Sequence, residues 1–183
     1  MKKIALGLLL VLIPIPLYLM SGYAGIDPAL LTSAINVMAL NNANFMPAFL
    51  GYLIIFLGLR RSWPSETISG TRVIVLGAAL GTAALWLFHL QGNVMPFPVE
   101  QIVRLWVTWR LLKWCEEQED WDWGYRIQRL RMSWYALAGA TAAGIVLGAA
   151  NLAMGMLWSG VSLGTGLYYT YTLYRLARMV PKA

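Results

Sequence analysis

The chain has 183 residues, of which 59% are hydrophobic and only 12% are charged. This apolar share is above that of a soluble domain, and most of the chain is needed for membrane spans, so no separate soluble domain fits. The net charge of +6 does not indicate nucleic-acid binding, because the basic residues stand in short clusters at the ends of apolar blocks. Clusters in that position are topology signals and contacts for anionic lipid head groups.

The apolar residues fall in long blocks, which predict an all-α integral membrane protein with one membrane domain, residues 1–183. We expect six transmembrane helices and two short interfacial helices. The predicted spans are residues 4–20, 45–59, 73–90, 96–115, 134–150 and 156–174.

The first block can be interpreted in two ways. Lys2 and Lys3 before an apolar stretch, with Gly22-Tyr23-Ala24 as a candidate cleavage site, are typical of a cleaved signal peptide. Pro14 and Pro16 do not forbid a span, because neighbouring helices can satisfy the freed backbone groups. We expect the block to be retained as the first transmembrane helix.

Two connections predict interfacial helices. Asp27 and Pro28 form a helix cap followed by proline at the first helical position, which predicts a short surface helix that ends at Asn41–Asn42; a re-entrant helix is the alternative. Residues 116–131 are acidic first and basic later, with tryptophans beside the charges, which predicts a helix on the inner head groups. A docking surface for a soluble partner is the alternative there. Residues 62–71 and 151–155 are expected to be turns.

The block from Pro96 to Cys115 decides the topology, because it carries Glu100, Arg104 and further basic residues between plainly apolar spans. If it crosses the membrane, loops 21–44, 91–95 and 151–155 contain no Lys or Arg, and the basic residues apart from Arg104 fall on or near the other side. If it lies on the surface, five spans remain and the basic residues divide between both sides. The positive-inside rule therefore predicts six spans with cytoplasmic termini, in a bacterial inner membrane. Arg104 near mid-membrane costs roughly 2.5–3.5 kcal/mol.

The candidate site is the polar face of this fourth span, formed by Glu100, Gln101, Arg104 and Thr108. Residues four apart stack on one helix face, and Glu before Arg at this spacing is the favourable order for an ion pair. One hypothesis is a solute or proton path, with Glu100 titrating and Arg104 contacting an anion; the other is a structural pair or a seam toward a partner subunit. His89 is a candidate relay for Glu100, although a single interfacial histidine is usually only an amphipathic side chain.

Three pairs of glycines have the small-xxx-small spacing that lets transmembrane helices approach closely. We expect them to pack helices within the bundle, with dimerisation as the alternative. The pairs are Gly77/Gly81, Gly144/Gly148 and Gly160/Gly164.

The first functional hypothesis is a small transport component or channel, favoured by the polar face and by a similar order of spans in the two halves of the chain. The second is a non-catalytic subunit of a larger membrane complex, favoured by the lack of any substrate motif. A lipid-modifying enzyme is third, and we expect no catalytic residues. One cysteine and one histidine exclude a disulfide, a multi-cysteine metal site and a bis-histidine haem within one chain, so we expect no cofactor and no metal. The expected partners are the lipid bilayer and other membrane proteins or further copies of the chain, not nucleic acid.

Overall fold

The computed structural model describes residues 2–12, 48–59, 66–91, 98–117, 124–150 and 152–177. Within these ranges the chain is all-helical, without strands, which confirms the predicted fold class at that level. The helices are α1 (Lys2–Leu12), α4 (Ala48–Gly58), α5 (Glu66–Leu90), α6 (Val99–Glu117), α7 (Gly124–Ala150) and α8 (Leu152–Ala177).

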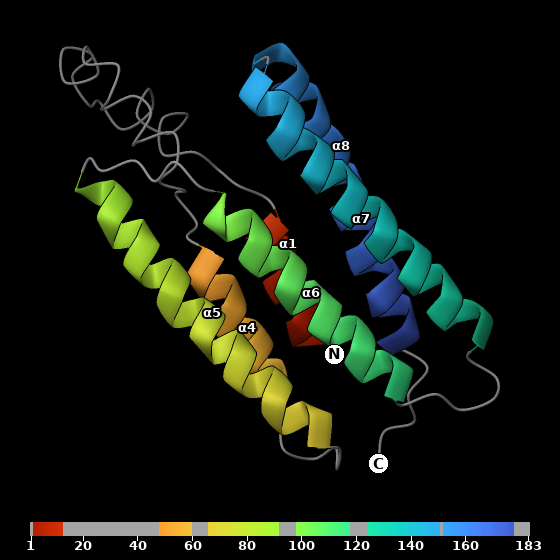
Figure 1. Cartoon of the computed structure of the whole chain (residues 1–183). Coiled ribbons are helices and arrows are strands. Elements are labelled where there is room, and N and C mark those ends of the chain that lie inside the picture. Colours follow the sequence, from red (N-terminus) through yellow and green to blue (C-terminus); the bar gives the residue numbers. More distant parts are fainter. Residues whose placement is uncertain are drawn as a thin grey trace.

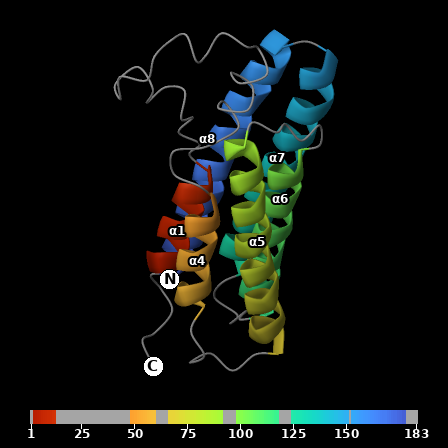
Figure 2. The same ribbon diagram turned by 90° about the vertical axis from the view of Figure 1, so that its left-hand side faces the viewer.

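The helices run alternately up and down in an elongated bundle (Figure 1). α1, α5 and α7 begin at one end of it, and α4, α6 and α8 end there. Figure 2 shows the same bundle turned by 90°, with α1 and α4 side by side. We call the end where α1 begins the basic end, because the described Lys and Arg residues other than Arg104 belong to the helix segments nearer to it. They are Lys2, Lys3, Arg72, Arg110, Lys113, Arg126, Arg129, Arg131 and Arg175.

Two helices are long and apolar enough to cross a membrane: α5 over Ser69–Phe88 and α7 over Gly124–Leu147. Only 28% of the tested window of each is buried inside the molecule. Large apolar side chains point outward from both; Leu80 is 66% exposed and Val146 is 67% exposed. Exposed apolar side chains in such numbers are unusual for a helix that faces water.

The first two predicted spans are described only in part. The described parts, α1 and α4, cover 11 residues each, which is about 16 Å of helix at 1.5 Å per residue. The predicted spans 4–20 and 45–59 are therefore only partly within the described residues. The predicted interfacial helix at 27–41 lies outside them.

The second predicted interfacial helix is not a separate element. Residues 116–117 end α6, and residues 124–131 are the first turns of α7, with 118–123 outside the described residues. The reason is that the buried face of α7 continues past the charged stretch. Ile127, Leu130 and Leu137 are all buried on one face, and neither glycine nor proline interrupts residues 125–138.

Both predicted turns are also shorter than expected. α5 begins at Glu66, so residues 66–71 are helical, and its buried face already begins with Thr71. α8 begins at Leu152, so only residue 151 separates it from the end of α7 at Ala150. The predicted turns contain Gly70 and Gly155, but a glycine inside a helix is tolerated where packing supports the helix.

The core lies toward the basic end and receives side chains from all the described helices. One cluster of buried side chains contains residues from α1, α4, α5, α6 and α8, among them Ile4, Tyr52, Val75, Leu111 and Tyr169. Leu130 adds α7. This cluster fixes α6 between α5 on one side and α7 on the other, which positions the polar face of α6 described below.

The backbones of α1 and α4 approach each other closely. A Cβ atom at Gly7 would lie 2.5 Å from the Gly51 carbonyl oxygen, and one at Gly51 would lie 2.6 Å from the Gly7 carbonyl oxygen. Only glycine permits backbones this close. The contact is a small-residue crossing of the kind that packs helices in lipid, formed by glycines outside the predicted pairs.

Candidate functional site

The predicted polar face of α6 is turned partly into the bundle. Thr108 is fully buried, Arg104 and Glu100 are half-buried, and Gln101 is exposed. Arg104 and Thr108 are one helical turn apart, so both can reach the same neighbouring helices. Gln101 lies on the outward side and does not join them.

Arg104 extends from α6 to both α7 and α8. Its Nη2 donates to Ser162 Oγ at 3.2 Å and to Thr141 Oγ1 at the longer distance of 3.5 Å. The two hydroxyls also bond to each other at 2.8 Å and are almost completely buried. The Nε of Arg104 is buried and has no hydrogen-bond partner among the described residues. A charged guanidinium is thus held by neutral hydroxyl groups while one of its donors has no acceptor there.

Thr108 connects the same three helices one turn closer to the basic end. Its hydroxyl donates to the backbone carbonyl of Arg104 at 2.9 Å and accepts the indole N–H of Trp134 at 3.1 Å. Its backbone carbonyl accepts the hydroxyl of buried Tyr169 at 2.7 Å. Such bonds satisfy polar groups that the helix interior would otherwise leave unpaired.

Two further residues act on Arg104 through their charge or dipole. Glu100, one turn earlier on α6, and Tyr52 of α4 both interact electrostatically with the guanidinium. Glu100 therefore contributes to the electrostatic surroundings of Arg104, and the ion pair between them stays a prediction. The structure brings together Glu100, Arg104 and Thr108 but separates Gln101 from them.

His89 belongs to the last turn of α5, and its side chain is outside the described part of the structure. The relay from Glu100 to His89 stays a prediction. Among the described residues, no group of three or more His, Cys, Asp or Glu side chains is placed to hold a metal ion.

The predicted glycine pairs lie apart from the close contact between α1 and α4. A Cβ atom added at Gly77, Gly81, Gly160 or Gly164 would meet no atom within 4 Å. Gly144 is half-buried in α7, and Gly148 belongs to the last turns of that helix, where side-chain surroundings are not described. Four of these glycines therefore do not pack against a described helix of the same chain.

Sequence reasoning missed Thr141, Ser162, Trp134 and Tyr169. A signal for the first two was present, because each is a hydroxyl residue within an apolar block. Thr141 is ten residues before Asn151, and Ser162 is eleven residues after it. In two antiparallel helices joined at that residue, they are at nearly the same height. Trp134 and Tyr169 gave no such signal, since aromatic residues are frequent throughout the chain.

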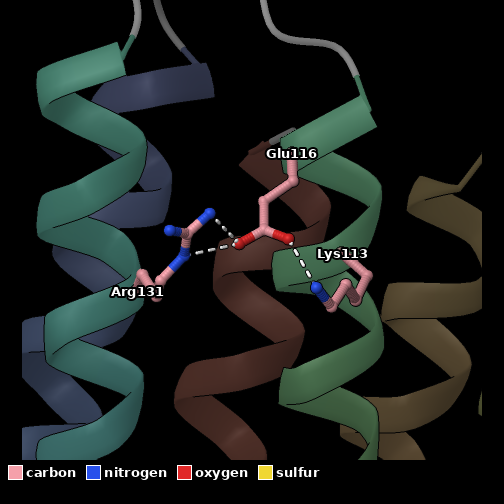
Figure 3. A network of polar contacts seen from close by, with 3 residues as sticks. All are labelled: Lys113, Glu116 and Arg131. Carbon is pink, nitrogen blue, oxygen red and sulfur yellow. Dashed lines mark hydrogen bonds and ion pairs between the residues drawn. The ribbon is translucent and has the colours of Figure 1, made fainter.

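A separate charged cluster joins α6 to α7 near the basic end (Figure 3). Glu116 accepts from Lys113 Nζ at 2.8 Å and from Arg131, through Nε and Nη2, at 2.8 Å each. The Glu116 side chain is 14% exposed, whereas its two partners are 43% and 47% exposed. Burial alone would raise the pKa of Glu116, but the hydrogen bonds from Lys113 and Arg131 outweigh it and lower this pKa below its ordinary value.

Comparison of the chain with protein families, with curated proteins and with solved structures found no match.

Proposed function

We propose that the chain is a six-span membrane protein of the bacterial inner membrane, with both termini in the cytoplasm. The apolar α5 and α7 support membrane insertion. The collection of basic side chains at one end of the bundle supports the orientation, because loops rich in Lys and Arg stay on the cytoplasmic side. In this topology α6 is the fourth span, and Glu116 lies at its cytoplasmic end.

The depth of the Arg104 cluster follows from this topology. Thr141 is ten residues after Arg131 in α7, a rise of about 15 Å, which is half of a hydrocarbon core of about 30 Å. Arg104 and Ser162 contact Thr141, so they are at the same depth. Ionisable side chains at this depth are costly and commonly belong to a solute or ion pathway.

We propose that the protein is a transport component or channel for small anions, with the polar face of α6 in the path. The observation that carries this proposal is the arrangement at Arg104. A guanidinium has five N–H donors. Among the described residues, this one donates to two hydroxyl groups, and its buried Nε has no acceptor. It retains the capacity to bind an acceptor-rich anion. The charge of Glu100 weakens that binding, which lets the anion leave again.

The test is anion flux into liposomes that contain the purified protein, with chloride, nitrate and formate as probes. We expect Arg104→Gln to lower the flux of the transported probe more than tenfold, because a buried charge-assisted bond is worth over 1.4 kcal/mol. Arg129→Gln is the matched control: it removes the same charge from an exposed position of α7 and should leave the flux unchanged. Wild-type flux in a correctly inserted Arg104→Gln variant, or no flux of any probe through the wild-type protein, contradicts the proposal.

The second candidate is a non-catalytic subunit of a larger membrane complex. The observation in its favour is that Gly77/Gly81 and Gly160/Gly164 have open space beside them, so another membrane helix can approach there. The mass of the protein extracted in mild detergent separates the two functions. A transport component is expected as a monomer or a small homo-oligomer, whereas a subunit is expected with other polypeptides.

A further inference from the structure

A second arginine of α6, remote from Arg104, is packed against α5 near the basic end. One of its terminal nitrogens, Arg110 Nη2, lies 3.1 Å from the position that a Cβ atom would take at Gly70. The absence of a side chain at Gly70 thus lets the guanidinium lie directly against the helix backbone. Any larger residue there would push it away.

Two buried polar groups on these parts of α5 and α6 have no hydrogen-bond partner among the described residues. They are the Nε of Arg110 and the hydroxyl of Thr71, the residue after Gly70, and both atoms are buried. Thr71 is completely buried as a residue. Adjacent Cα atoms are about 3.8 Å apart, so Thr71 belongs to the turn of α5 that the guanidinium touches. Buried donors without acceptors are unfavourable, and an acceptor supplied from outside the chain would relieve both.

The neighbouring charges favour an anion as that acceptor. Lys113, on the next turn of α6, is neutralised by Glu116 and lies over the Trp109 ring at 4.8 Å. Arg72, next to Thr71, lies over the Phe56 ring at 4.8 Å. An aromatic ring holds a cation without cancelling its charge. Arg72 therefore keeps its positive charge, whereas the Glu116 carboxylate neutralises Lys113. Arg72 and Arg110 therefore leave excess positive charge around Thr71.

We propose that Thr71 and Arg110 form a binding site for a phosphate group. Phosphate offers several acceptor oxygens, and the planar guanidinium binds two of them at once, while the threonine hydroxyl donates to another. Arg110 is seven residues before the end of α6, about 10 Å along the helix, which places the site near the head groups at the basic end. The phosphate belongs either to an anionic lipid or to a small soluble phosphate compound. The proposal does not depend on the transport of anions.

Native mass spectrometry with added phosphatidylglycerol tests the lipid source. We expect the wild-type protein to retain one lipid that Arg110→Gln and Thr71→Val bind roughly tenfold more weakly. Arg110→Lys keeps the charge but loses the planar fork, and it should be intermediate. The control is Arg129→Gln, which removes an exposed charge from the same end and should bind like the wild type.

Inorganic phosphate, titrated against the thermal stability of the protein in neutral phosphatidylcholine nanodiscs, tests the soluble source. Stabilisation that Arg110→Gln abolishes and Arg129→Gln retains supports a soluble phosphate ligand. Equal loss of lipid binding in Arg110→Gln and Arg129→Gln overturns the site, because general surface charge then explains the binding. No effect of Arg110→Gln with either probe in a folded protein also overturns it, since water would then satisfy the two groups.

Discussion

At the scale of single residues, the spacing of polar side chains on α6 predicts a shared face, but it does not predict what these side chains contact. Glu100, Arg104 and Thr108 share a face because they are four residues apart. Thr141 and Ser162 complete the cluster from two other helices. Their contribution depends on the rotation of α7 and α8 about their axes, and apolar blocks without strong periodicity do not specify that rotation.

Glu116 gives a residue-scale prediction with a pH dependence. Its folded-state pKa is below the ordinary value, so its contribution to stability is present at neutral pH and is lost as the pH falls through that folded-state pKa. We expect Glu116→Gln to destabilise the protein at pH 7 by about 1 kcal/mol or less, because its partners are half-exposed. Thermal unfolding in detergent at several pH values measures this difference.

The matched control is Glu117→Gln, which makes the same change of charge at the neighbouring, exposed position. We expect a smaller loss of stability there. A Glu116→Gln effect that persists undiminished at acid pH, where the wild-type carboxyl is protonated, would refute the electrostatic explanation.

At the scale of elements, the sequence predicted that helices form, but it did not predict which glycines lie at the contacts between them. The pairs at 77/81 and 160/164 have the expected spacing, yet open space lies beside them. Gly7 and Gly51, which do form a close crossing, belong to different helices and have no common sequence pattern. A small-xxx-small pair shows that a helix can be approached closely, but the partner helix determines whether it is.

The crossing of α1 and α4 gives a prediction at this scale. Gly7→Ala and Gly51→Ala each add a methyl group about 2.5 Å from a backbone oxygen, so the helices must separate. We expect a loss of about 1–3 kcal/mol in the free energy of unfolding, as for other overpacked sites. Denaturation in detergent, followed by tryptophan fluorescence, measures it.

Gly77→Ala and Gly164→Ala are the controls, because the added methyl group meets nothing within 4 Å. Alanine favours helix over glycine by up to about 1 kcal/mol, so these variants should be unchanged or slightly more stable. Equal destabilisation in all four variants would show that the α1–α4 contact is not as close as described.

At the scale of the whole molecule, the described Lys and Arg residues other than Arg104 lie toward one end of the bundle. The same spacing that predicts one basic side of the membrane puts these residues at one end of an alternating bundle. The number of spans is still a prediction, since only α5 and α7 are long and apolar enough by themselves among the described helices.

The topology prediction is tested by accessibility of single cysteines in a Cys115→Ala background, which removes the chain's only cysteine. Gln91→Cys should react with an impermeant reagent from the periplasmic side, whereas Gly124→Cys and Lys182→Cys should react only from the cytoplasm. If all three react from outside, α6 does not cross the membrane. Arg104 would then lie outside the hydrocarbon core, and the anion path would lose its site.

The sequence by itself determined the all-helical class, the apolar blocks and the spacing of Glu100, Arg104 and Thr108 along α6, because these depend on composition and on positions within one helix. Tertiary structure alone decided three other features: the continuation of α7 through residues 124–131, the hydroxyl partners of Arg104, and the approach of Arg110 to Gly70. Each depends on how two or more helices are rotated and how closely they approach. Those quantities are set by the packing of side chains from distant parts of the chain, which no local pattern encodes.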